Sequence, residues 1–242
     1  MISRYIFFKN LNKKRILGFL VIPAIALNFL INPSPSDSRT LSLSTGEAGS
    51  PYHEFSLTLK EYLENISTND FNLKIQESSG SVENIENLEN KISNIAIVQN
   101  DVAHYMFYGK HSFTSTQVFA GIFPLFSENI WIVSKKQLNI RGISDFENKV
   151  ISLGPLGSGT YLNALDILES AGLKKGIDYI GKNLNAEDTT NGLIQGNIEV
   201  AFYTSKSLPG KLKQASAFYK IHDVPQLVIK DLATKKPYYE KS

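Results

Sequence analysis

The sequence predicts an α/β protein of two lobes, each a mainly parallel sheet flanked by helices. Two observations carry this prediction. Strand-like segments alternate with helix-like segments of about a dozen residues in both halves of the chain, which is the pattern of parallel α/β units. Between the two runs, residues 118–134 form a long β-rich stretch that Pro124 interrupts, as expected of a connection between lobes.

In the first run, strands are expected over 40–44, 71–77 and 95–99, and helices over 51–63 and 82–92. The start of the first helix is marked by Ser50 and Pro51, because serine is a good N-cap and proline suits the first helical position. In the second run, strands are expected over 150–153, 178–181 and 199–203, and helices over 160–171 and 187–195.

The N-terminus is built like a secretory signal. Basic residues precede the apolar run 16–31, and the polar linker NPSPSDS follows it. A small-x-small cleavage site is offered by Ala24, Ile25 and Ala26. We therefore expect residues 1–32 to be a signal peptide or membrane anchor and the folded part to work in the periplasm or elsewhere outside the cytoplasm. A buried core helix is the third interpretation of this run.

Composition excludes several classes of function. The protein has no cysteine, so it has no disulfide framework, no thiolate zinc site and no lipidated cysteine. Because the positive charge is concentrated before residue 36, the rest of the chain has no basic footprint for nucleic acid. The four histidines lack metal-ligand spacing, and LGSGT around Ser158 lacks the outer glycines of a G-x-S-x-G nucleophile turn. We predict no enzyme activity and no cofactor.

Three turns share a pattern of glycine and hydroxyl residues between a strand and a helix: TGEAGSPY (45–52), SSGSVEN (78–84) and GPLGSGTY (154–161). Such turns lie at the carboxyl edge of an open α/β sheet, where ligands bind, and helix N-termini attract carboxylate or phosphate groups. The third turn has the glycine spacing of a nucleotide loop, but Thr160 and Tyr161 stand where lysine and Ser/Thr are needed. The alternative is that these turns only cap their helices.

The same turns, with IAIVQNDVAHYMFYG between the second and the third, resemble in order the motifs of the TAXI-type solute-binding proteins of tripartite ATP-independent periplasmic (TRAP) transporters. The resemblance runs from about Leu41 to Tyr239. It implies a two-lobed periplasmic-binding-protein fold of type II, which captures a small organic anion or amino acid. The implied partners are that solute and the membrane subunits of an ion-coupled permease. A binding protein of an ABC importer, or a sensor-like or non-binding relative, is the alternative.

The resemblance also implies which residues bind the solute. The predicted ligand-binding residues are Thr45, Gly46, Gly49, Ser50, Tyr52, Gly80, Ser81, Asn84, Gln99, Asp101, Gly157, Ser158, Gly159, Thr160 and Tyr203. The sequence departs from the family pattern at Glu47, Glu54 and Asn100, where glycine, proline and serine are usual. A glutamate near the pocket repels an anionic ligand, so Glu47 bears on the type of solute.

Family members generally continue beyond the segment that resembles Pro237–Tyr239, and that tail returns to the first lobe. We therefore expect lobe 1 over 33–118, hinge or crossover strands over 119–134, lobe 2 over 135–220, and a shortened return segment toward lobe 1 over 221–242.

Overall fold

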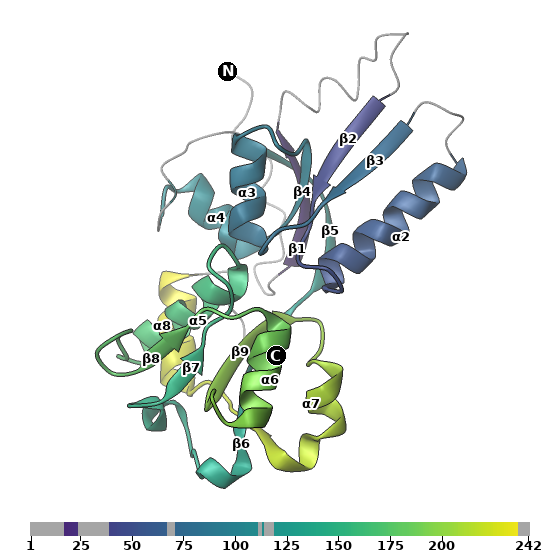
Figure 1. Cartoon of the computed structure of the whole chain (residues 1–242). Coiled ribbons are helices and arrows are strands. Elements are labelled where there is room, and N and C mark those ends of the chain that lie inside the picture. Colours follow the sequence, from purple (N-terminus) through teal and green to yellow (C-terminus); the bar gives the residue numbers. More distant parts are fainter. Residues whose placement is uncertain (1–16, 24–38, 67–70, 111–112, 114–118, 237–242) are drawn as a thin grey trace. The chain divides into compact units, whose positions relative to one another are not determined.

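The computed structural model describes residues 17–23, 39–66, 71–110, 113 and 119–236. The described chain divides after Phe126 into two compact units, unit 1 before the division and unit 2 after it (Figure 1). Each unit contains one five-stranded sheet with helices packed on it. The division falls inside the stretch expected to connect two lobes, 119–134, so that stretch belongs partly to each unit.

Unit 1 has a sheet of strand order β3-β2-β4-β1-β5. Its elements are β1 (Leu17–Pro23), β2 (Arg39–Ser44), α2 (Pro51–Ile66), β3 (Phe71–Gln76), α3 (Ser81–Glu89), β4 (Ile95–Gln99), α4 (Asn100–Phe107) and β5 (Phe119–Ser127). Strand β2 is parallel to both β3 and β4, whereas β1 is antiparallel to β4. The carboxyl ends of β2, β3 and β4 therefore lie at one edge of the sheet.

Alternating residues of these strands face different helices. Leu41 and Leu43 of β2 belong to the apolar cluster that packs against α2. The neighbouring Ser44 turns the other way, and its hydroxyl accepts a hydrogen bond from Asn87 Nδ2 of α3 at 3.1 Å. The sheet is thus covered by α2 on one face and by α3 on the other, as expected of a parallel α/β unit.

Strand β1 comes from the apolar run expected to be a signal peptide, an anchor or a buried helix. Its backbone pairs with β4 in the register Gly18↔Gln99 to Val21↔Ala96. Strand β5 is hydrogen-bonded to β1, so it is joined to the rest of the sheet through this segment. The other residues of 1–32 lie outside the described residues. In the part of the chain that the structure describes, no helix combines the length and the apolar character needed to cross a membrane.

Unit 2 has a sheet of strand order β10-β6-β9-β7-β8. Its elements are β6 (Asn129–Lys135), β7 (Val150–Ser152), α5 (Gly159–Ser170), β8 (Ile180–Lys182), α6 (Ala186–Gln195), β9 (Val200–Ser205), α7 (Gly210–Gln214), β10 (Tyr219–Ile221) and α8 (Gln226–Lys235), with short 3₁₀ turns at 136–138, 143–146 and 216–218. Strand β7 is parallel to β8 and β9, and β6 is antiparallel to β9 and β10.

The β-rich connection is interrupted at Glu128, between β5 and β6, and not at Pro124. Proline is tolerated inside a strand at the edge of a sheet, because an edge strand has backbone N–H groups that need no ladder partner. Pro124 is exposed and lies in β5, the last strand in the order of its sheet. The expectation that Pro124 interrupts this β-rich stretch was therefore wrong.

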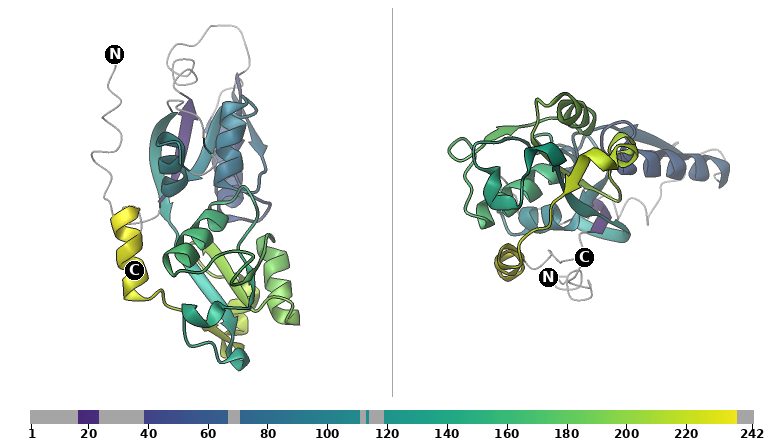
Figure 2. Two further views of the ribbon diagram at one scale, coloured as in Figure 1. Left: turned by 90° about the vertical axis from the view of Figure 1, so that its left-hand side faces the viewer. Right: turned by 90° about the horizontal axis from the view of Figure 1, so that it is seen from below.

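The described part of the segment 221–242 lies in unit 2, whereas the sequence led us to expect a return toward the first lobe. Strand β10 pairs with β6, and α8, yellow in Figure 2, packs against α5. Lys236, just after α8, donates a hydrogen bond to Asp166 of α5, whose side chain is fully buried. Residues 237–242 lie outside the described residues.

Candidate functional site

The three glycine and hydroxyl turns are strand-to-helix turns in the structure. Residues 45–50 connect β2 to α2, residues 77–80 connect β3 to α3, and residues 153–158 connect β7 to α5. Because β2 and β3 are parallel neighbours, the first two turns lie side by side at the carboxyl edge of the unit 1 sheet. The third occupies the equivalent edge of unit 2. The structure thus places the three turns at the carboxyl edges of the parallel strands, as the sequence led us to expect.

Asn84 joins two turns of unit 1 and strand β4 through its buried side chain. Its Nδ2 atom donates to the carbonyl of Thr45, which follows β2, and at 2.7 Å to the carbonyl of Ile97 in β4. Its Oδ1 atom accepts a hydrogen bond of 2.6 Å from the hydroxyl of Ser78, which follows β3. The amide therefore fixes the ends of all three parallel strands, a positioning role that the motif did not reveal.

Ser81 and Gln99 link α3 to the end of β4. The backbone N–H of Gln99 donates to Ser81 Oγ at 3.0 Å, and both residues are buried. Asp101 is fully buried at the start of α4, and its Oδ1 accepts from the backbone N–H of Val102 at 2.8 Å. These predicted ligand-binding residues lie beneath the sheet edge and shape it. Their contact with a solute stays a prediction.

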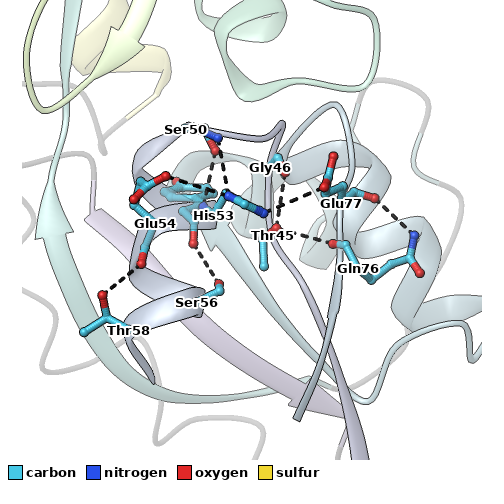
Figure 3. A network of polar contacts seen from close by, with 11 residues as sticks. Thr45, Gly46, Ser50, His53, Glu54, Ser56, Thr58, Gln76 and Glu77 are labelled. Atoms are coloured by element: carbon cyan, nitrogen blue, oxygen red, sulfur yellow. Dashed lines mark hydrogen bonds and ion pairs between the residues drawn. The ribbon is translucent and has the colours of Figure 1, made fainter. Parts of the chain in front are cut away.

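The first turn is organised around His53, a residue that the sequence analysis did not single out (Figure 3). Its Nδ1 atom accepts a hydrogen bond of 3.3 Å from the backbone N–H of Gly49, and its Nε2 atom lies 3.8 Å from a carboxylate oxygen of Glu77, after β3. Ser50 Oγ accepts from the backbone N–H of His53 at 3.3 Å. The imidazole therefore ties the first turn to the second.

The predicted residues differ in how much solvent they meet. Gly49 is exposed, Ser50 and Gly80 are half-buried, and Gly46 is buried. A Cβ added to Gly46 would lie 2.6 Å from Ser50 Oγ, so any larger residue there requires the Ser50 hydroxyl to move. The ring of Tyr52 is buried in the core cluster of unit 1, 5.8 Å from the ring of Phe126, and its contact with a solute stays a prediction.

The turn of unit 2 depends on a left-handed glycine. Gly154 has a φ of 90°, and a Cβ there would lie 2.8 Å from Thr160 Cγ2. Ser158 is the N-cap of α5, because its Oγ accepts from the backbone N–H of Tyr161 at 3.1 Å. Thr160 Oγ1 accepts from the backbone N–H of Thr204 at 3.3 Å, at the end of β9. This turn therefore caps α5, which is the role that the sequence analysis gave as the alternative to solute binding.

Gly157 and Gly159 complete this turn in different ways. Gly157 is half-buried with a φ of 82°, in the left-handed region that favours glycine. Gly159 is the first residue of α5 and is buried. Both lie beside the cap, and their contact with a solute stays a prediction.

Replacing Gly154 with alanine is expected to destabilise unit 2 by about 1–3 kcal/mol, because the new methyl group combines a strained φ with a clash against Thr160. Urea unfolding followed by Trp131 fluorescence measures this, since the only tryptophan of the chain lies in unit 2. The matched control is Gly210→Ala, where a Cβ meets nothing within 4 Å. Equal midpoints for the two variants would contradict the role given to Gly154.

The side chain of Tyr203 packs in the core of unit 2. Its ring belongs to the core cluster that includes Val133 and Leu193, and its hydroxyl lies 3.1 Å from Thr190 Oγ1 of α6. Burial raises the pKa of this phenol above its ordinary value. The structure therefore shows a packing role for Tyr203, and its predicted contact with a solute is untested.

Acidic side chains surround the edge of unit 1. Glu47 lies in the first turn, Glu77 follows β3, and Glu83 is in the first turn of α3, where it accepts from the backbone N–H of Ser79 at 2.8 Å. In the part of the chain that the structure describes, no group of three histidine or carboxylate side chains is arranged to hold a metal ion. Three carboxylate residues thus lie in the turns and at the helix start that form the edge of unit 1.

Two histidines make the fold sensitive to acid. Burial, and to a lesser extent the Lys110 ammonium, lower the pKa of His104 from 6.5 to about 4. Burial and Lys220 lower the pKa of His222, whose Nε2 lies 2.7 Å from Ser134 Oγ. Since the unfolded chain binds protons that the folded chain does not, stability declines as pH falls from about 6.5 toward 4.

We therefore expect a lower melting temperature at pH 5 than at pH 7, and a smaller difference in the variant His104→Gln. Calorimetric melting across this pH range checks the expectation. The control is His53→Gln, which removes an imidazole that lies beside two carboxylates, those of Glu54 and Glu77. A pH dependence that His104→Gln leaves unchanged would rule out His104 as its source.

Solved structures of binding proteins share this fold. An ancestral arginine-binding protein bound to arginine is 18% identical with a TM-score of 0.51, over 84% of this chain and 96% of that one. The holo arginine-binding protein of T. maritima is 15% identical with a TM-score of 0.51, over 76% and 77%. The alkanesulfonate-binding protein SsuA from Xanthomonas axonopodis pv. citri, bound to MOPS, is 13% identical with a TM-score of 0.50, over 79% and 63%.

These similarities confirm the predicted fold class, the two-lobed α/β fold of periplasmic binding proteins. The chain spans only 56% of the length of the periplasmic sulphonate-binding protein SsuA from Escherichia coli. A model of the NMT1-like family matches residues 43–242, from the end of β2 through all of unit 2. Because this match includes the three turns and most of the chain, the protein belongs to the NMT1-like family.

Proposed function

We propose that this protein is an extracytoplasmic solute-binding protein that captures a small organic anion or amino acid for uptake by a membrane permease. One observation carries the proposal: each unit gathers glycine and hydroxyl turns at the carboxyl edge of its parallel strands, at the N-termini of α2, α3 and α5. In open α/β sheets this edge is where ligands bind. The proposal involves no chemical step.

Among the two solute classes, the charges of unit 1 favour an amino acid. Glu47, Glu77 and Glu83 lie around the turns of unit 1 and disfavour a second carboxylate there. An ammonium or guanidinium group is attracted to the same edge. The solute class that fits is therefore one with a cationic group and an acidic group, rather than a dicarboxylate.

Binding is tested by calorimetric titration of the full chain with glutamate, glutamine, arginine, succinate and taurine. If an amino acid binds, Glu47→Gln is expected to weaken its binding, because the variant removes a carboxylate from the first turn. Glu61→Gln changes the same charge on the exposed surface of α2 and serves as the control. Tighter binding of succinate by Glu47→Gln, with no binding of any amino acid, would assign a dianionic solute instead.

Two kinds of permease fit the proposal. The order of the four motifs favours a TRAP permease, and the binding-protein fold that the solved structures share fits an ABC importer at least as well. Uptake of the identified solute into cells that produce the protein separates them. Uptake that survives ATP depletion and needs an ion gradient supports the TRAP permease, and uptake that stops with ATP depletion supports the importer.

Export from the cytoplasm is part of the same proposal. It is supported by the basic N-terminus followed by the apolar run 16–31, and by the periplasmic binding-protein fold. Fractionation of cells that produce the full chain checks it. Recovery of the protein in the cytoplasmic fraction alone would contradict the proposed location.

A further inference from the structure

Lys175 is held at the carboxyl edge of the unit 2 sheet, beside the turn 153–158. Strands β7 and β8 are parallel and in register, so the residues that follow them lie together. Asn183 follows β8, and its Nδ2 atom donates to the carbonyl of Gly154 at 3.1 Å. Lys175 Nζ donates to Asn183 Oδ1 at 3.3 Å. An ammonium group is thereby tied to the glycine turn through one amide side chain.

The path of the lysine side chain depends on a glycine. Lys175 precedes β8, and a Cβ added to Gly181 in that strand would lie 2.9 Å from Lys175 Cε and 3.3 Å from its Cδ. The absence of a side chain at Gly181 thus leaves room for the lysine stem to cross the strand. Beyond it, Nζ reaches the hydroxyl of Tyr161 at 3.4 Å and lies 5.0 Å from the centre of that ring.

Both side chains that contact this ammonium group, Asn183 and Tyr161, are uncharged. By contrast, Lys149 lies 3.8 Å from Glu199, Lys211 lies 3.9 Å from Glu187, and Lys235 lies 2.8 Å from Asp231. In the described part of the chain, Lys175 contacts no carboxylate. The amide and the phenol orient the ammonium without neutralising it, so its charge remains available to an anion.

We infer that Lys175, positioned by Asn183 and Tyr161, binds the acidic group of the solute at the edge of unit 2. The group is a carboxylate or a sulfonate, which share a single negative charge and acceptor oxygens. This inference rests on the proposed function and deepens it. Lys175 at the edge of unit 2 favours a solute that carries an anionic group.

The test uses small anions that carry only the acidic group. The full chain, labelled with ¹⁵N, is titrated with acetate and with methanesulfonate while the amide signals of Gly157, Thr160 and Asn183 are followed. We expect saturable shifts in the wild type and binding weakened about fivefold or more in Lys175→Met, in line with the loss of a charge-assisted hydrogen bond at an exposed site. Methionine keeps an unbranched stem over Gly181.

Two further variants separate binding from structure. Lys174→Met removes the same charge from the neighbouring exposed residue and is expected to bind like the wild type. Lys175→Arg keeps the charge and is expected to restore binding. Unshifted signals in the wild type, or equal binding by Lys175→Met, would overturn the inference.

The outcome is also separable from that of the proposed function. If the solute found by calorimetry binds equally well to Lys175→Met, the inference fails and the proposed function stands. If acetate binds through Lys175 but none of the five solutes binds, the anion site stands and the proposed function fails.

Discussion

A chain that begins at Arg39 is expected to lose the cooperative unfolding of unit 1 while unit 2 stays folded. Strand β1 is the antiparallel partner of β4 and the only connection of β5 to the other described strands of the sheet. Its removal exposes the edge of β4, whose five residues are all buried, and detaches β5. The free energy of unfolding of a folded domain is only about 5–15 kcal/mol. We therefore expect the loss of an interior strand to remove most of the stability of unit 1.

Hydrogen exchange in the two units measures this effect. Amides of β4 are expected to exchange much faster in the shortened chain, whereas Trp131 fluorescence, which reports on unit 2, should give an unchanged urea midpoint. Within the full chain, Leu20→Pro is expected to act in the same direction, because β1 has neighbours on both sides and proline removes a ladder hydrogen bond. Leu20→Val is the control.

The same measurement bears on the processing of the N-terminus. If the shortened chain protects β4 as well as the full chain does, β1 contributes nothing to the sheet, and cleavage after Ala26 leaves unit 1 intact. Rapid exchange of β4 in the shortened chain means instead that cleavage removes an interior strand from the sheet of unit 1. The N-terminal residue of the protein recovered from the exported fraction then shows which form the cell keeps.

Asn84→Leu is expected to destabilise unit 1 by about 3 kcal/mol or more. The substitution removes three buried hydrogen bonds of the amide, with the carbonyls of Thr45 and Ile97 and with the hydroxyl of Ser78, and each such bond contributes about 1 kcal/mol. Because the amide joins the ends of three strands, the turns at the sheet edge should also move. Urea unfolding followed by circular dichroism gives the change in stability.

Asn90→Leu provides the comparison for this substitution. Asn90 is exposed and lies at the other end of α3. Its substitution replaces the same amide group with the same apolar side chain. It is expected to alter the free energy of unfolding by less than about 0.5 kcal/mol. Similar losses for the two variants would contradict the positioning role of Asn84.

The order of strands and helices could be predicted because its signals are local. The helix that begins at Pro51 is indicated by its cap and by apolar spacing, and the helix expected over 160–171 follows a glycine turn; they are α2 and α5. Strand β8 begins two residues later than expected. Asp178 closes the preceding turn instead, through hydrogen bonds with the backbone of Lys174.

The strand β1 and the polar framework of the site could not be predicted. An apolar run such as 16–31 has no period that distinguishes a signal from a buried strand, and the partner that makes it a strand lies at β4, far along the chain. The contacts of Asn84 with Thr45 and of His53 with Glu77 likewise join residues distant in sequence. Lys175 carries no motif at all, and only the path over Gly181 shows where its ammonium lies.

Hydrogen exchange of the full chain with and without the solute found by calorimetry tests the central claim most directly. The proposed function predicts that the solute slows exchange at the turns 45–52, 78–84 and 154–161, in both units, with the sheets and the outer helices little changed. Protection confined to other segments, or none at a saturating concentration of a bound solute, would contradict it.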